Sequence, residues 1–169
     1  TYGDAPCEED AMYLPEKFKI VPVANEIDIS GTVYTDSINM KNYHRATFIL
    51  QIGTLAVNDS HVWAMSGIGD ATYTSNLPAK YAFGGAAYGS ANCDVLAADA
   101  SNISGGVPVA IHILNATYSD FMLIIEVEAA DMDMANQEEW LALKFLNTDG
   151  GATGNVSGIA ILSSDSHEA

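Results

Sequence analysis

Alternation of apolar and other residues over residues 107–128 is the sequence feature that most restricts the fold of this chain. Apolar side chains recur at every second position in residues 107–113 and again in residues 121–127, on either side of the polar stretch 115–119. A period of two places these side chains on one face of an extended strand. Two such strands joined by a short polar connection are typical of a β-hairpin. We therefore predict a hairpin here, with one face in the hydrophobic core.

Shorter runs of the same alternation occur along the rest of the chain. Clusters of Gly, Asn, Asp and Ser separate them, and these residues favour turns. No long amphipathic helical pattern competes, and residues 92–100 and 130–134 are the candidates for a helical turn. The other strands that we expect cover residues 19–23, 37–40, 46–52, 61–65, 81–83, 140–146 and 156–162.

This pattern predicts an all-β fold of about eight to ten short strands with little helix. A parallel α/β sheet would need helices between its strands, so we predict a β-sandwich of the jelly-roll or immunoglobulin-like kind. A length of 169 residues fits one domain, which we place at residues 17–162. Residues 1–16 are expected to form an acidic N-terminal arm, and residues 163–169 a polar C-terminal tail.

The charge of the chain limits the partners that it can bind. The sequence contains 22 acidic and 6 basic residues, which gives a formal net charge of −16. Nucleic-acid binding requires clustered Lys and Arg that neutralise phosphates, and anionic membrane surfaces attract the same residues. No apolar run reaches the ~18 residues of a membrane span. We therefore expect neither a nucleic acid nor a membrane as a partner.

No catalytic or metal-ligating pattern stands out, so we predict that the chain is not an enzyme and holds no cofactor or metal. Its histidines are His44, His61, His112 and His167. None of them has a second histidine or a carboxylate at the spacing of a zinc site. In the predicted hairpin, His112 lies on the outer face of its strand, as Glu126 and Glu128 do on theirs, and we expect a cross-strand ion pair.

Calcium is the alternative to the absence of a metal. Asp131, Asp133 and Asp149 lie in turns, and carboxylate oxygens suit a hard cation. These turns lack the glycine and the bidentate glutamate of an EF-hand loop, and acidic residues are common in turns. We therefore expect ordinary turns at these positions and keep calcium as the alternative.

Cys7 and Cys93 are the two cysteines of the chain. Two cysteines do not make the disulfide framework of a small secreted domain. We expect reduced thiols, with a bridge or an intermolecular link as alternatives.

Two groups of residues are candidates for contacts with other proteins. The first lies in the acidic arm and consists of Glu8, Glu9, Asp10 and Tyr13. Such arms are usually flexible unless a partner holds them, so this group is a possible partner-binding segment. The second group is Trp63 and Trp140, which alternate with small residues on predicted strands. We expect them to pack against the second sheet or a neighbouring subunit, with stacking on sugars as the alternative.

Short motifs along the chain carry a resemblance to a known group of proteins. They are LPEKFKIVP at residues 14–22, NMKNY at 39–43 leading into ATFI at 46–49, LIIEV at 123–127 followed by ADMD at 130–133, and GIAIL at 158–162. In this order they resemble small β-rich structural proteins that are encoded in the head-gene regions of tailed bacteriophages. Residues 1–13 and the Gly-, Ala- and Tyr-rich residues 71–106 do not follow the pattern of these proteins.

This resemblance implies a structural virion protein, and specifically a capsid decoration (cement) protein that binds and stabilises the assembled head shell. It implies as partners the major capsid protein and copies of the chain itself in a homotrimer. The implied location is the outer surface of the head, after synthesis in the host cytoplasm. The alternatives are a neck, tail or fibre component of the virion, and a carbohydrate-binding β-sandwich that uses Trp63, Trp140 and the tyrosines of residues 73–88.

Overall fold

The structure is a computed structural model that describes residues 18–84, 87, 89, 101–102, 110–147 and 152–164. Predictions for the arm residues Glu8, Glu9, Asp10 and Tyr13, for both cysteines, for the helical turn at residues 92–100 and for Asp149 lie outside the described residues. None of the described helices is long and apolar enough to cross a membrane.

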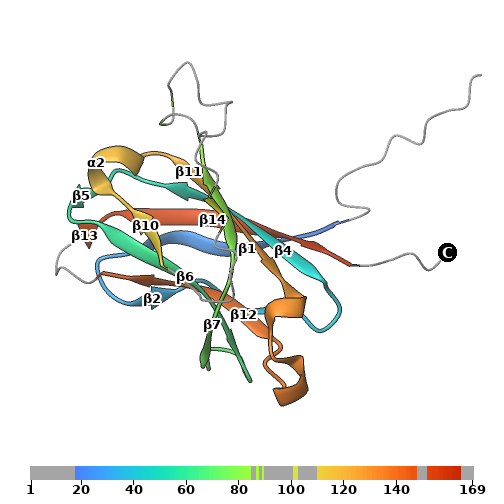
Figure 1. Cartoon of the computed structure of the whole chain (residues 1–169). Coiled ribbons are helices and arrows are strands. Elements are labelled where there is room, and N and C mark those ends of the chain that lie inside the picture. The colour runs from blue at the N-terminus through green and yellow to red at the C-terminus, as the bar shows by residue number, and fades with distance from the viewer. Residues whose placement is uncertain are drawn as a thin grey trace, which may run out of the picture.

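The first sheet has six strands in the order β1–β14–β4–β11–β8–β9, and all of its pairings are antiparallel (Figure 1). The strands are β1 (Phe18–Asp28), β4 (Arg45–Ile52), β8 (Lys80–Phe83), β9 (Ser101–Asn102), β11 (Met122–Glu128) and β14 (Asn155–Ser163). Strands from the two ends of the described chain, β1 and β14, are neighbours at one edge, so this sheet is assembled from segments far apart in the sequence.

The second sheet also has six strands, and its main order is β10–β6–β12–β2. The strands are β2 (Val33–Tyr34), β3 (Ile38–Asn39), β6 (Ser60–Gly67), β7 (Ser75–Leu77), β10 (Ile111–Ile113) and β12 (Trp140–Leu146). Strand β3 also pairs with β12, and β7 pairs with β6. A separate two-stranded ribbon joins β5 (Ala56–Val57) to β13 (Ala152–Thr153). The helical pieces are short: α2 (Asn115–Tyr118), η1 (Ala129–Asp131) and η2 (Met134–Asn136).

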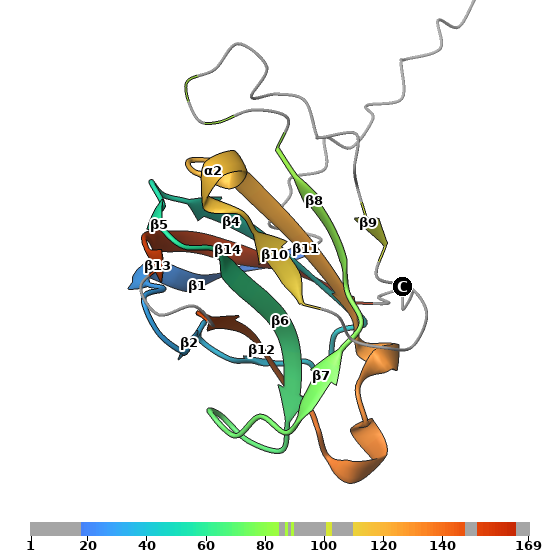
Figure 2. The same ribbon diagram turned by 60° about the vertical axis from the view of Figure 1, so that its left-hand side comes forward.

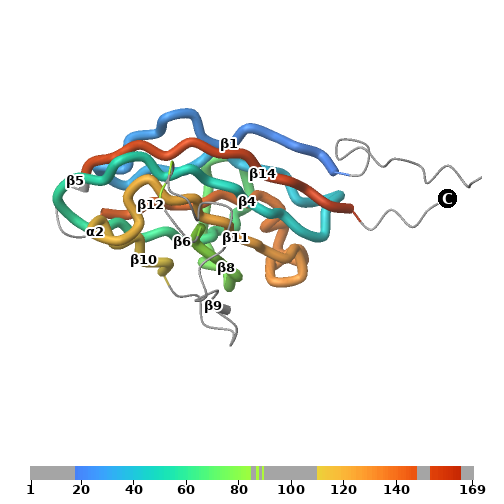
Figure 3. The backbone as a smooth tube through the Cα atoms, turned by 90° about the horizontal axis from the view of Figure 1, so that it is seen from above, coloured from blue at the N-terminus to red at the C-terminus, as the bar shows by residue number. Residues whose placement is uncertain are grey.

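The hydrophobic core lies between the two sheets and contains buried residues of both. Figure 3 looks onto the first sheet, whose strands β1, β14, β4, β11 and β8 follow one another across the view. In β4 every second residue is buried, and the same alternation occurs in β11. Phe48 of the first sheet and Phe145 of the second are both fully buried members of this core. The prediction of an all-β sandwich with little helix is therefore confirmed.

The predicted hairpin at residues 107–128 is wrong, because its two strands belong to different sheets. Strand β10 pairs with β6 of the second sheet, whereas β11 lies between β4 and β8 of the first. Figure 2 shows helix α2 between the two strands. Residues 114–121 form this connection, which is long enough to cross the ~10 Å between packed sheets. Alternation identified the buried face of each strand but could not identify its partner.

The expected ion pair of His112 with Glu126 and Glu128 is wrong for the same reason. His112 lies directly opposite His61 of β6, and the two rings make an edge contact with centroids 4.0 Å apart. The two glutamates lie in the other sheet, where they contact basic side chains of β4 and β8.

Candidate functional site

The outward side chains of the first sheet form rows across its strands, because directly opposite residues of antiparallel strands point to the same side. The middle row is Pro22, Ile159, Ile49, Ile124 and Ala82, from β1, β14, β4, β11 and β8 in turn. Every member of this row is apolar, and none lies on the core side of the sheet. Five adjacent strands therefore present an unbroken apolar row on the outside of the molecule.

The two flanking rows extend this apolar surface on opposite sides. One row contains Ile20 and Ile161, and the other contains Met122 next to Gln51. Together these side chains form the outer apolar face, which consists of Ile20, Pro22, Ile49, Ala82, Met122, Ile124, Ile159 and Ile161. Ile20 is 39% exposed and Ile159 is 37% exposed, and both are large apolar side chains that water contacts.

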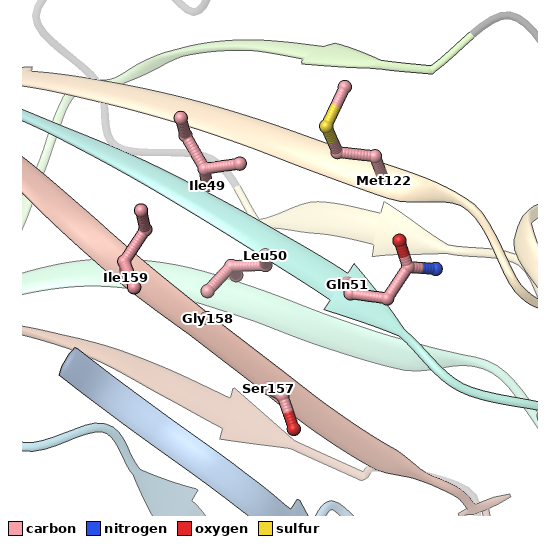
Figure 4. A pocket seen from close by; sticks show the side chains of 7 residues that line it. All are labelled: Ile49, Leu50, Gln51, Met122, Ser157, Gly158 and Ile159. Atoms are coloured by element: carbon pink, nitrogen blue, oxygen red, sulfur yellow. The ribbon is translucent and has the colours of Figure 1, made fainter. Parts of the chain in front are cut away.

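A shallow hollow of about 230 Å³ lies within this face. It is lined by Ile49, Leu50, Gln51, Met122, Ser157, Gly158 and Ile159, which come from three adjacent strands (Figure 4). Sites for small molecules and cofactors usually have volumes of about 300–1,000 Å³ and enclose most of the ligand. The hollow is smaller than that, and most of its surface is apolar. Its size and chemistry suit an apolar side chain of another protein.

Charged residues occupy one corner of the same sheet surface, and their charges balance. The Arg45 side chain lies 3.8 Å from Glu126 and 3.4 Å from Glu128, and Lys80 lies 3.8 Å from Glu128. Two positive and two negative groups give this corner a formal charge of zero. In a chain of net charge −16, this corner therefore carries none of the acidic excess, while the exposed acids Glu26 and Asp28 lie at the far end of β1.

Trp63 and Trp140 both point away from the first sheet. They alternate with core residues of β6 and β12, so they lie on the outer face of the second sheet. Since they do not pack between the sheets, contact with a neighbouring subunit or a sugar remains the prediction for them. Trp63 lies opposite Lys144, four residues from Trp140, so the two indoles are attached about 13 Å apart along the strands.

Tyr34 extends the row of Trp63 and Lys144 on the second sheet. Its ring stacks on Tyr73 with centroids 4.8 Å apart. Burial raises the pKa of the Tyr73 phenol above its ordinary value. This surface combines aromatic rings with one lysine, and it lies on the opposite side of the sandwich from the outer apolar face.

Asp131 and Asp133, the described members of the turn acids considered for calcium, lie in or beside short 3-10 turns. Asp133 caps η2, with its carboxylate accepting hydrogen bonds from the backbone N–H of Asn136 at 3.3 Å and from the Asn136 side chain at 2.6 Å. Asp131 lies in η1. Among the described residues, no group of three or more His, Cys, Asp or Glu side chains is placed to hold a metal ion.

Glu138 is a buried carboxylate that sequence reasoning missed. It is only 9% exposed, and it accepts hydrogen bonds from the hydroxyls of Ser66, Thr74 and Ser75 at 2.6, 2.7 and 2.9 Å. The Ser66 and Thr74 hydroxyls lower the pKa of this carboxyl, although its burial acts in the opposite direction. The partners are 63 to 72 positions away in the sequence, so no local signal could have identified the cluster.

Comparison with protein-family models, with curated proteins and with solved structures finds no match to this chain.

Proposed function

We propose that this chain is a structural assembly protein, and specifically a capsid decoration protein that binds and stabilises the head shell of a tailed bacteriophage. The observation that carries the proposal is the outer apolar face, which offers contact area on a regular sheet and contains no reactive group. Exposed apolar patches of several hundred Å² commonly mark protein–protein contact sites. Such a surface suits an assembly role better than catalysis.

The resemblance to phage head proteins supplies the specific part of the proposal. Its strand motifs fall on β1, β4, β11 and β14, which are four adjacent strands of the first sheet. These are the strands that carry most of the outer apolar face. The resembling segments thus support a shared role for this sheet in assembly.

A decoration protein acts by linking neighbouring subunits of a shell, so many modest contacts add up without any chemistry. The proposed partners are the major capsid protein and other copies of the chain, on the outer surface of the head. An acidic protein is compatible with that side of the shell, since it repels packaged nucleic acid. Thr1–Ala169 carries too few basic residues for contacts with DNA.

Cosedimentation with undecorated, expanded shells from the source virus tests this function. Saturable binding with a copy number that matches the local symmetry axes, together with a higher melting temperature of the shells, is the expected result. Absence of the protein from purified shells and presence at the portal or tail would replace decoration by a neck, tail or fibre role. Absence from every particle would overturn the virion proposal.

The aromatic row on the second sheet favours one second candidate, which is carbohydrate binding. Tyr34 and Trp63 flank Lys144 there, and aromatic rings on a flat sheet can stack against the apolar faces of sugars. A glycan array followed by calorimetry tests this function. Binding that is lost in Trp63→Ala but retained in Ile159→Lys would support it, and an array without signal would exclude it for the glycans displayed.

A further inference from the structure

We propose that the outer apolar face binds the same face of a second copy of this chain, in a two-fold symmetric contact. The inference rests on the proposed assembly role and names the partner at that surface. Three properties of the described residues lead to it: the charge balance of the face, the distribution of exposed apolar side chains, and the shape of the face.

The charge balance favours a second copy at this surface. Two chains of net charge −16 repel each other over most of their surfaces. The first sheet contributes little to this repulsion over most of its outer surface, because Arg45 and Lys80 neutralise Glu126 and Glu128 and the middle row is uncharged. The exposed acids Glu26 and Asp28 lie beyond the outer apolar face, at the end of β1. Two copies can therefore approach closely with these sheets facing each other.

The distribution of apolar residues indicates that the outer apolar face binds the same face of the second copy. Large exposed apolar side chains elsewhere in the described chain are Tyr34, Val57, Ile68 and Leu114. Val57, Ile68 and Leu114 lie on separate elements, and Tyr34 belongs to the aromatic row that also contains Lys144 and Trp63. A contact between the outer apolar face and that aromatic row would cover apolar groups with the charged Lys144, whereas a symmetric contact buries apolar groups on both copies.

The shape of the face is compatible with self-association. A two-fold contact uses the same patch on both copies, so that patch must contain both protrusions and recesses. Ile20 and Ile159 are the more exposed side chains, and the hollow beside Met122 and Ile49 is apolar. A protruding isoleucine of one copy has a recess of suitable chemistry on the other.

The size of the face predicts a weak dimer. Five strands at ~4.8 Å spacing and three rows at ~6.8 Å spacing give a surface of about 19 Å by 14 Å. A pair of such faces buries roughly 500 Å² in total before the overlap of side chains is counted, which is below the ~1,200 Å² of stable complexes and indicates a weak, transient contact. We expect a dissociation constant on the order of 100 μM, which is sufficient on a shell where neighbouring copies are held at high local concentration.

Analytical ultracentrifugation of the purified chain, at concentrations from about 10 μM to about 1 mM, tests the inference because this range brackets the expected affinity. The face variant is Ile159→Lys, and the matched control is Ile68→Lys, which changes a 59% exposed isoleucine away from the first sheet. Both variants change the net charge from −16 to −15, so both reduce general repulsion equally. A lysine at an exposed position keeps its charge in water in the monomer, and circular dichroism checks the fold.

The expected result is a concentration-dependent dimer for the natural chain and for Ile68→Lys, and a dissociation constant raised by about tenfold or more for Ile159→Lys. The effect is large because a two-fold contact contains the substitution twice. If Ile159→Lys does not fold, Ile20→Lys on the edge strand β1 takes its place. A monomer at the highest concentration, or association that both face variants leave intact, would overturn the inference.

Two further outcomes separate this inference from the proposed function. A trimer that Ile159→Lys leaves intact would overturn the two-fold contact and still agree with the resemblance to head proteins. A dimer that forms through this face but never binds shells would support the contact and overturn the decoration role. Salt provides an independent readout: association should strengthen with ionic strength, because salt screens the repulsion between two acidic chains, and weakening would contradict an apolar contact.

Discussion

Replacing Glu138 by glutamine should destabilise the sandwich, because this buried carboxylate adds side-chain hydrogen bonds between the neighbouring strands β6, β7 and β12. Glu138 precedes β12, and its hydrogen-bond donors lie at the end of β6 and at the beginning of β7. Ser66 is fully buried and donates the shortest of the three bonds, at 2.6 Å. Glutamine keeps the shape of the side chain but removes the charge and places an amide N–H₂ where a hydroxyl now donates.

The magnitude follows from the number and type of these bonds. A hydrogen bond to a charged group contributes about 1.5–3 kcal/mol to stability, and bonds within one cluster are not additive. We expect Glu138→Gln to lower the free energy of unfolding by about 2–3 kcal/mol. Ser66→Ala alone should cost about 1.5–3 kcal/mol. The double variant should lose less than the sum, with a coupling energy of about 1 kcal/mol or more.

Chemical denaturation of the four proteins at pH 7 measures this double-mutant cycle. A Glu138→Gln variant within about 0.5 kcal/mol of the natural chain would place the residue among ordinary surface positions and refute the reasoning. A coupling energy near zero would show that Ser66 and Glu138 act independently, in contradiction to the short bond between them.

The pH dependence of the same variant provides a second check. The hydroxyls hold the pKa of Glu138 below its usual value of about 4.5 in the folded protein, so the unfolded chain binds the proton more readily. The contribution of this carboxylate is therefore complete above pH 4.5 and is lost as the pH falls through the lower pKa of the folded state. The difference in stability between the natural chain and Glu138→Gln should be constant near neutral pH and shrink below pH 4.5.

Three other substitutions test the packing of the first sheet. Ile125→Asp places an unpaired charge at a fully buried position of β11, and we expect a loss of about 4 kcal/mol or more and no cooperative melting transition. Gly158→Ala should cost about 1–3 kcal/mol in thermal denaturation, because its Cβ would lie 2.6 Å from the Ile49 carbonyl oxygen. Gly31→Ala, whose Cβ would meet nothing within 4 Å, should change the melting temperature little and serves as the control.

Several strands could be predicted from the sequence because alternation is a local property. The expected strand at residues 140–146 matches β12, and those at 46–52 and 156–162 match β4 and β14 to within one residue at each end. Successive side chains of an extended chain point to opposite sides, so an apolar residue at every second position identifies both the strand and its buried face. The fold class followed from the number of such runs and the absence of helical patterns.

Strand pairing could not be predicted in the same way. Residues 107–128 contain two alternating runs, and both β10 and β11 bury the predicted face, but against different partners in different sheets. An alternating strand is satisfied by any neighbour that completes its hydrogen bonds and covers its apolar side. The choice between neighbours depends on how all strands pack together, which no short stretch of sequence contains.

The candidate site belongs to this second category. The alternation of β4 separates Ile49 from its buried neighbours, but it could not show that Pro22, Ile124 and Ile159 would lie beside it. The same holds for Glu138 and its three hydroxyl donors. Local sequence therefore determined the strands, their faces and the acidic charge of this protein. The tertiary structure alone decided which outward side chains form a continuous surface, because residues from distant strands become neighbours only when the sheet is complete.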